Sequence, residues 1–287
     1  MITSYFELGV KMDLKNEMLN FRNINVEAYP ELKDYKTVEI YNQFIGCGGL
    51  YLATKMVRQM NLKKGDIVLD LGCGFGSASI YLARNFGVIV VAVDLWFSPT
   101  KLSERINTED YSDKVIPLNM DITQHMPFAA NYFDAIYCMN SLFLYGDNIE
   151  FLKRLLNTLK TGGIFCIGSE CFNQEPNFKS KEDIPVEFNF NLTWDVWDSC
   201  YSKYHSPIWW YTLLNETNLL NITYCEELDD GIILWEDLAL NYYNYISKKI
   251  LSIGAEIPQE KLIEQINYGK TNVPYLTLYV LSGAKKL

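Results

Sequence analysis

The sequence predicts an α/β protein built around a parallel β-sheet, and three observations support this. The apolar segment Ile67–Leu71 runs into glycines at positions 72, 74 and 76, after which a helical pattern begins at Ser77. Residues 88–93 form a continuous apolar run, as expected of a strand buried on both faces. Further apolar runs alternate with segments of helical spacing, which is typical of parallel strands joined by crossover helices.

Composition narrows the class of protein. With 287 residues and 49% hydrophobic residues, the chain is long enough for a sizeable core in one elaborated domain. It has 25 basic against 35 acidic residues, a net charge of −10, and no Lys/Arg cluster longer than a pair. A nucleic-acid partner is therefore not expected. With two histidines, no metal site is expected either.

Membrane and redox features indicate a cytoplasmic protein. The longest apolar run is far shorter than the roughly 18 residues of a membrane span, and the N-terminus lacks the apolar core of a signal peptide. The seven cysteines form no Cys-x-x-Cys pair, so we interpret them as reduced thiols.

The first strand, turn and helix form a ligand-binding pattern. Glycines permit a backbone path that side chains would block, and the new helix directs its N–H groups at a ligand. A dinucleotide fingerprint would place its third glycine at position 77, which is Ser. The second strand ends at Asp94, about 20 residues on, where a carboxylate can accept hydrogen bonds from ribose hydroxyls.

The order Asp70-x-Gly72-x-Gly74-x-Gly76 resembles motif I of the class I S-adenosylmethionine (SAM)-dependent methyltransferases. Two later segments, Pro-Phe-x4-Phe-Asp-x-Ile over 127–136 and Leu-Lys-x-Gly-Gly over 159–163, also resemble that family. The Gly-rich loop at 46–49 is similar to the loop that covers SAM in small-molecule methyltransferases of the phosphoethanolamine, sarcosine and tocopherol type. The resemblance spans residues 44–283 and is strongest over 67–168.

The resemblance implies a Rossmann-like, doubly wound seven-stranded sheet of order 3-2-1-4-5-7-6 with strand 7 antiparallel. It implies one methyltransferase domain over 1–287: N-terminal lid helices (1–60), a SAM-binding core (61–170) and acceptor-side cap insertions (171–212 and 229–272). The cofactor would be SAM and the product S-adenosylhomocysteine (SAH). The Gly-rich loop at 46–49 is then a lid over the ligand, although a simple hinge before the next helix is the alternative.

The remaining elements follow in order. Weak helices are expected over 31–43, and a helix after Gly49 with Leu52, Met56, Val57 and Met60 on one face. Pro117 predicts that a third strand, 114–119, lies near an edge. A fourth strand (135–139), a helix with leucines at 152, 155, 156 and 159, and a fifth strand (164–168) come next. The last strands are 221–225 and 274–282, with insertion helices near 235–246 and 262–266 between them.

The predicted cofactor-binding residues occupy strand ends and the two glycine-rich segments. Leu95 or Trp96 would cover a face of adenine. By resemblance, Asp121 takes the exocyclic amine and Ile122 packs on the ring. The segment 139–141 ends the fourth strand and would face the methionine half of SAM or the acceptor. The full set is Gly46, Gly49, Asp70, Gly72, Cys73, Gly74, Gly76, Asp94, Leu95, Trp96, Asp121, Ile122, Met139 and Asn140.

The acceptor side is less clearly encoded, because an activated methyl group needs orientation more than a specialised catalyst. Residues 194–211 are rich in Trp, Tyr and Asp, which suits a small acceptor such as an amine, or simply a packed aromatic cap with an acidic rim. His205 and Glu170 are the candidate general bases, with a structural role as the alternative for both. A nicotinamide oxidoreductase and a SAM- or SAH-binding protein without turnover are the competing functions.

Overall fold

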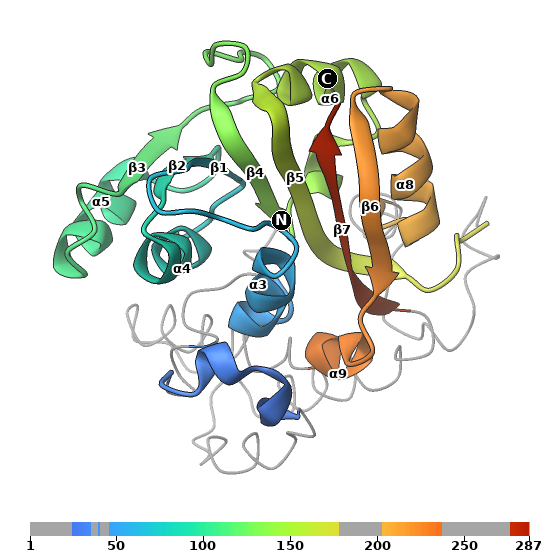
Figure 1. Cartoon of the computed structure of the whole chain (residues 1–287), viewed down its shortest axis with the longest axis horizontal. Helices are drawn as coiled ribbons and strands as arrows, with labels where there is room; N and C mark the ends of the chain where they lie inside the picture. Colours follow the sequence, from blue (N-terminus) through green and yellow to red (C-terminus); the bar gives the residue numbers. More distant parts are fainter. Residues whose placement is uncertain (1–24, 36–39, 41–45, 178–202, 237–275, 287) are drawn as a thin grey trace, which may run out of the picture.

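The computed structural model describes residues 25–35, 40, 46–177, 203–236 and 276–286. Seven strands form one sheet of order β3-β2-β1-β4-β5-β7-β6 (Figure 1). Their bounds are β1 Ile67–Leu71, β2 Ile89–Asp94, β3 Val115–Asn119, β4 Phe133–Met139, β5 Leu159–Phe172, β6 Leu220–Glu227 and β7 Leu276–Lys285. Strands β1 to β5 pair in parallel, and β7 is antiparallel to both neighbours. The predicted order and the antiparallel seventh strand are confirmed.

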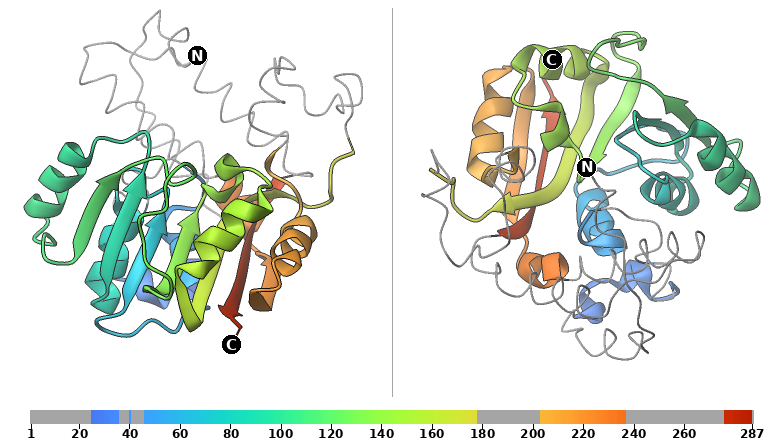
Figure 2. Two further views of the ribbon diagram at one scale, coloured as in Figure 1. Left: turned by 90° about the horizontal axis from the view of Figure 1, so that it is seen from above. Right: turned by 180° about the vertical axis from the view of Figure 1, so that it is seen from behind.

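Helices cover both faces of the sheet (Figures 1 and 2). One apolar layer packs under α3 (Gly49–Val57), α4 (Ser77–Phe86), α5 (Pro99–Thr108) and α9 (Gly231–Glu236). The other packs under α6 (Ile149–Asn157) and α8 (Pro207–Glu216). Short 3-10 helices are η1 (Val26–Ala28), η2 (Pro30–Leu32) and η3 (Leu142–Tyr145). Along β1, Val68 belongs to the first layer, and Leu69 and Leu71 to the second, because successive side chains of a strand point to opposite faces.

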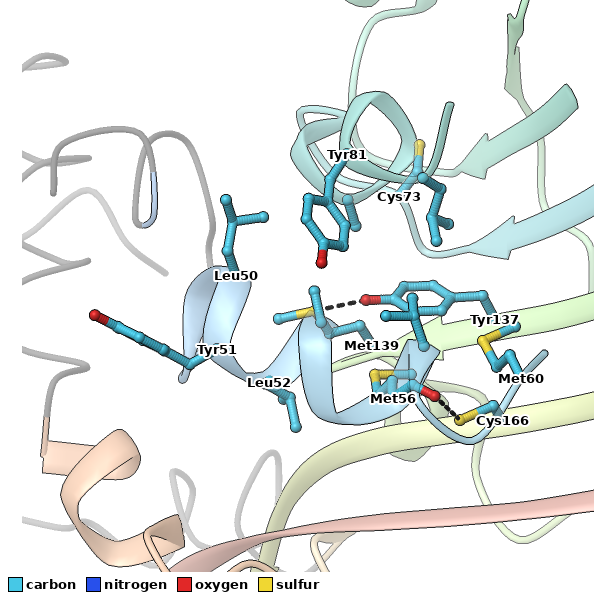
Figure 3. Packing of buried hydrophobic residues seen from close by; sticks show 14 of the residues in the cluster. Leu50, Tyr51, Leu52, Met56, Met60, Cys73, Tyr81, Tyr137, Met139 and Cys166 are labelled. Atoms are coloured by element: carbon cyan, nitrogen blue, oxygen red, sulfur yellow. Dashed lines mark hydrogen bonds between the residues drawn. The ribbon is translucent and has the colours of Figure 1, made fainter. Parts of the chain in front are cut away.

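Side chains of helix α3 pack directly on Gly168 of β5. A β-carbon on Gly168 would be 2.6 Å from Sδ of Met56, so a larger residue would displace that side chain. The backbone carbonyl of Met56 accepts from the Cys166 thiol, and Leu52 and Met56 belong to the same buried cluster as Tyr137 (Figure 3). This packing fixes α3, and with it the glycine-rich loop that precedes the helix.

Asp134 joins three strands at one end of the sheet. Its carboxylate accepts from the backbone N–H of Ile67 at 2.9 Å and from Lys160 Nζ at 2.7 Å. These contacts join β1, β4 and β5 at the amino ends of β1 and β4, away from the strand ends where ligands bind in such sheets. This position indicates a structural role for Asp134.

Several predicted boundaries were wrong. Helix α6 ends at Asn157, and Leu159 belongs to β5, which runs from Leu159 to Phe172 and so begins before the predicted strand at 164–168. The pairing shifts between Phe133 and Ala135, and Gly162 with φ 76° lies in this irregular stretch. The extra residues form a bulge, which glycine accommodates more easily than other residues. Residues 30–32 form a 3-10 helix where a longer helix was expected.

Some predictions lie outside the described residues. These are the parts of the expected 31–43 helices at 36–39 and 41–45, and most of the insertion helices over 235–266. Within the described ranges, no helix has the length and apolar character of a membrane span.

Candidate cofactor site

The turn after β1 is bent back against β2 by its own backbone. The N–H groups of Gly72 and Cys73 both donate to the carbonyl of Val93, at 2.8 and 3.0 Å. Gly72, Gly74 and Gly76 have φ values of 76°, 55° and 76°, a region that other residues enter at a cost. A β-carbon on Gly72 would also be 2.4 Å from Oγ of Ser141. The alternate glycines therefore serve both conformation and close packing.

Asp94 connects the end of β2 to this turn. Its Oδ2 accepts from the Gly74 N–H at 2.8 Å, and its Oδ1 accepts from the N–H groups of Trp96 and Phe97 at 2.8 and 3.2 Å. The residue is partly exposed, and Oδ2, which accepts one hydrogen bond, has a second lone pair for a ligand hydroxyl. The carboxylate is thus held in one orientation at the position predicted for ribose binding.

Two side chains that the sequence reasoning missed support the site, Asn119 at the Asp94 loop and Arg105 at the glycine turn. Asn119, the register partner of Asp94 on β3, directs Nδ2 at the carbonyls of Asp94, Leu95 and Phe97, at 3.0, 2.8 and 3.2 Å. Arg105 on α5 donates to the carbonyl of Phe75 at 2.7 Å. The sequence feature that could have indicated Asn119 is its position as a polar residue at the end of β3, next to the strand that carries Asp94.

Asp70 lies beneath the turn and is fully buried. Its Oδ2 accepts from the Ser79 hydroxyl at 2.5 Å, which ties β1 to the first turn of α4. Burial raises the pKa of this carboxyl to about 7, although the Ser79 hydrogen bond works in the opposite direction and the nearby Asp94 adds to the rise. Asp70 is therefore a buried group that can titrate near neutrality.

The loop at 46–49 packs on Asn140, immediately beyond β4. Asn140 Nδ2 donates to the carbonyl of Cys47 at 2.9 Å, and a β-carbon on Gly46 would be 2.3 Å from that nitrogen. Gly48 and Gly49, with φ values of 79° and 48°, begin α3. Because the carbonyl of Cys47 requires a donor, the orientation of the amide is determined. Its Oδ1 is buried and accepts no hydrogen bond from the described residues.

The other predicted cofactor residues differ in accessibility. Leu95 and Trp96 are 52% and 70% exposed, so their side chains are available to a ligand. Asp121 accepts from the hydroxyl and backbone N–H of Thr123, which lower the pKa of its carboxyl. Ile122 and Met139 are buried, with 2% and 7% exposed, and offer a ligand little surface.

The candidate bases have separate partners. Glu170 is buried near the end of β5, where Oε1 accepts from the Cys47 thiol at 3.2 Å and Oε2 from Ser169 at 3.0 Å. The Nδ1 of His205 lies 2.6 Å from Oε1 of Glu175, and its ring stacks on Trp209 at 3.6 Å. The structure places Glu170 against the glycine-rich loop and His205 beside the start of α8, without pairing them with each other.

The surroundings of His205 form a small polar cluster. Burial raises the pKa of the Glu175 carboxyl, but hydrogen bonds from His205 and from the N–H and hydroxyl of Ser206 outweigh it, and the pKa is lowered overall. The predicted aromatic and acidic residues over 194–201 lie outside the described residues. In the described ranges, no group of three or more His, Cys, Asp or Glu side chains is arranged to hold a metal ion.

Comparison with known proteins agrees with this geometry. Residues 69–167 match a family model described as a methyltransferase domain. Phosphoethanolamine N-methyltransferase 1 of Arabidopsis thaliana is 31% identical over 137 residues, which cover 45% of this chain and 26% of that protein. The chain thus spans about a quarter of the length of that relative.

Two solved structures have a similar fold. Haemonchus contortus phosphoethanolamine N-methyltransferase 2, in complex with phosphomonomethylethanolamine and SAH, gives a TM-score of 0.64 at 17% identity, covering 86% of this chain and 55% of that one. The [4+2]-cyclase SpnF gives 0.60 at 15% identity, covering 82% and 81%. Residues 69–167 are thus similar to a methyltransferase domain, and the sheet of this chain has the fold of these solved structures.

Proposed function

We propose that this protein is a SAM-dependent methyltransferase that transfers a methyl group to a small-molecule acceptor. The observation that carries the proposal is the position of Asp94, whose carboxylate is bonded to the glycine turn at the carboxyl end of β2. In open α/β sheets ligands bind beyond these strand ends, at the point where the strand order reverses. Here that point lies between β1 and β4.

The residues present suit the cofactor. Asp94 would accept the ribose hydroxyls, and the exposed Leu95 and Trp96 would cover adenine. The glycines of the turn let the ligand approach the backbone. Asn140 Oδ1, which lacks a donor within the described chain, would accept from the ammonium of the methionine half. Buried acceptors without a partner are rare in proteins, so this oxygen supports a donor-bearing ligand.

When bound, SAM supplies a methyl group already activated on a sulfonium. The chain then has to bind, orient and exclude water, and orientation alone can contribute roughly 7–11 kcal/mol. A base is needed only for an acceptor that arrives protonated. For that case we propose Glu170 or His205, because both lie close to the end of β5, Glu170 within the strand and His205 bonded to it through the Phe172 N–H.

We extend the proposal to an amine acceptor and a cytoplasmic location. The name of the Arabidopsis thaliana relative specifies phosphoethanolamine, an amine, as the acceptor of that enzyme. None of the six described cysteines forms a disulfide with another, as in a reducing compartment.

The test is SAH production, followed by mass spectrometry, with SAM and a fractionated metabolite extract. We expect SAH with one class of fraction only, together with a product one methylene heavier. If the protein binds SAH but yields no SAH with any fraction, the result would favour a binding protein or another reaction. The [4+2]-cyclase, which has a similar fold, is an example of a protein named for another reaction. Stabilisation by NAD but not by SAH would favour an oxidoreductase instead.

A further inference from the structure

Tyr145 has a fixed position directly above the glycine turn. It ends η3, which follows β4 after Asn140 and Ser141. Its ring stacks on Phe151 of α6, with centroids 5.4 Å apart and planes inclined by 17°. A stacked ring held by a neighbouring helix has little freedom to turn, so the direction of the hydroxyl is set by the fold.

The hydroxyl points at Gly72. A β-carbon on Gly72 would lie 3.5 Å from Oη of Tyr145 and 2.4 Å from Oγ of Ser141, so both side chains lie close to the backbone of the turn. The neighbouring Ser141 hydroxyl donates to the carbonyl of Leu71 at 2.6 Å. Tyr145 Oη makes no hydrogen bond to any residue in the described part of the chain, and the residue is partly exposed. The donor of Tyr145 is therefore available to a ligand.

The phenol is neutral at this position. Burial raises the pKa of the Tyr145 hydroxyl well above its ordinary value, and Cys138, Asp94, Cys73 and Asp70 add to the rise. A neutral phenol with acids around it retains its proton. It serves a ligand as a hydrogen-bond donor and not as a base.

The place of Tyr145 in the sheet indicates which part of the ligand it meets. With the ribose at Asp94 on β2, a ligand in the crevice runs over β1 towards β4. Tyr145 lies on the β4 side of Gly72, which is the side of the methionine half. That half contains an ammonium, a sulfonium and a carboxylate. The proposed function assigns the ammonium to Asn140 Oδ1, and the carboxylate then requires a donor.

We propose that the Tyr145 hydroxyl donates a hydrogen bond to the carboxylate of the methionine half of SAM and SAH. This inference rests on the proposed function. It identifies Tyr145 as a binding residue at the same site, which no sequence motif indicated.

The test is calorimetric titration of wild type and Tyr145→Phe with two ligands, SAH and 5′-methylthioadenosine. The second ligand keeps the adenosine but lacks the amino-acid part. Tyr145→Phe removes only the hydroxyl and keeps the stacked ring. We expect SAH to bind at least about tenfold more weakly to the variant, and 5′-methylthioadenosine to bind within about twofold of wild type.

The matched control is Tyr132→Phe, whose side chain is 41% exposed at the start of β4 and whose hydroxyl makes no hydrogen bond to the described residues. It should change neither affinity. Unchanged SAH affinity in Tyr145→Phe, or an equal loss for both ligands, overturns the inference while leaving the proposed function intact. Wild-type protein that binds neither ligand would instead remove the proposed function itself.

Discussion

The two sides of the candidate site are constructed differently. On the cofactor side, Asp94 accepts from three backbone N–H groups, and Gly72 and Cys73 donate to one carbonyl of β2. On the acceptor side, the carboxylates mainly meet side chains: Glu170 meets Cys47 and Ser169, and Glu175 meets His205 and Ser206. The cofactor side thus depends on backbone hydrogen bonds and on glycine conformations, which few sequences can provide. The side-chain pairs of the acceptor side could be formed by many different residues.

Gly72→Ala should have the largest effect on the cofactor side. A φ of 76° costs an alanine about 1–2 kcal/mol of stability, and its β-carbon would also meet Ser141 at 2.4 Å. We expect SAH affinity to fall more than about a hundredfold, since the turn must shift. Calorimetry with SAH and urea unfolding measure the two effects.

The matched control is Gly162→Ala, where φ is 76° but no atom lies within 4 Å of the added carbon. It should lose only the conformational part of the stability and keep SAH affinity. Equal SAH affinities in the two variants would mean that the close approach to Ser141 has no role in binding.

The pH dependence of stability should show the buried Asp70. Its pKa of about 7 exceeds the value near 4 of an unfolded chain, so between these pH values the folded protein keeps a proton that the unfolded chain releases. The free energy of unfolding should therefore fall as pH rises from about 4 to about 7, by up to about 4 kcal/mol, and then level off. Urea unfolding of wild type and Asp70→Asn measures this, and the variant should lack the decline.

The pKa of Asp134 is shifted in the direction opposite to that of Asp70, so its contribution to stability has the opposite pH dependence. Burial raises the pKa of its carboxyl, but the Ile67 N–H and Lys160 outweigh it and the pKa is lowered. Its contribution to stability is present above the unfolded pKa near 4 and is lost as pH falls through the folded pKa. A wild-type profile that Asp70→Asn leaves unchanged between pH 4 and 7 would rule out the assignment to Asp70.

Asn119→Asp should have the smallest effect. It replaces the donor facing the carbonyls of Asp94, Leu95 and Phe97 with an acceptor, and so loosens the loop without touching the ligand. Because Asn119 is exposed and water can substitute, we expect about a fivefold loss of SAH affinity. Asn107→Asp on the exposed face of α5 adds the same charge and should bind SAH as wild type does. Equal affinities in the two variants would leave the Asn119 contacts without a role.

The sequence predicted the structure best where the backbone can adopt only one conformation. Strands β1 and β2 and the glycine turn followed from apolar runs and alternate glycines, and the order of the sheet followed from the family resemblance. The start of β5 did not, because Leu159 is buried in either a helix or a strand and helical spacing does not distinguish them. Asn119 and Tyr145 carry no motif. Their roles arise from the register of β3 with β2 and from the approach of η3 to Gly72, which only the folded chain brings about.

The central claim is that Asp94 at the carboxyl end of β2 binds the cofactor. The most direct test is calorimetric titration of SAH into wild type, Asp94→Ala and Asp66→Ala. Asp66 precedes β1, at the opposite end of the sheet, where its carboxylate accepts from the Lys63 N–H at 2.8 Å. We predict that Asp94→Ala weakens SAH binding by about tenfold to a hundredfold and that Asp66→Ala leaves it unchanged. SAH binding of wild-type strength in Asp94→Ala would contradict the account.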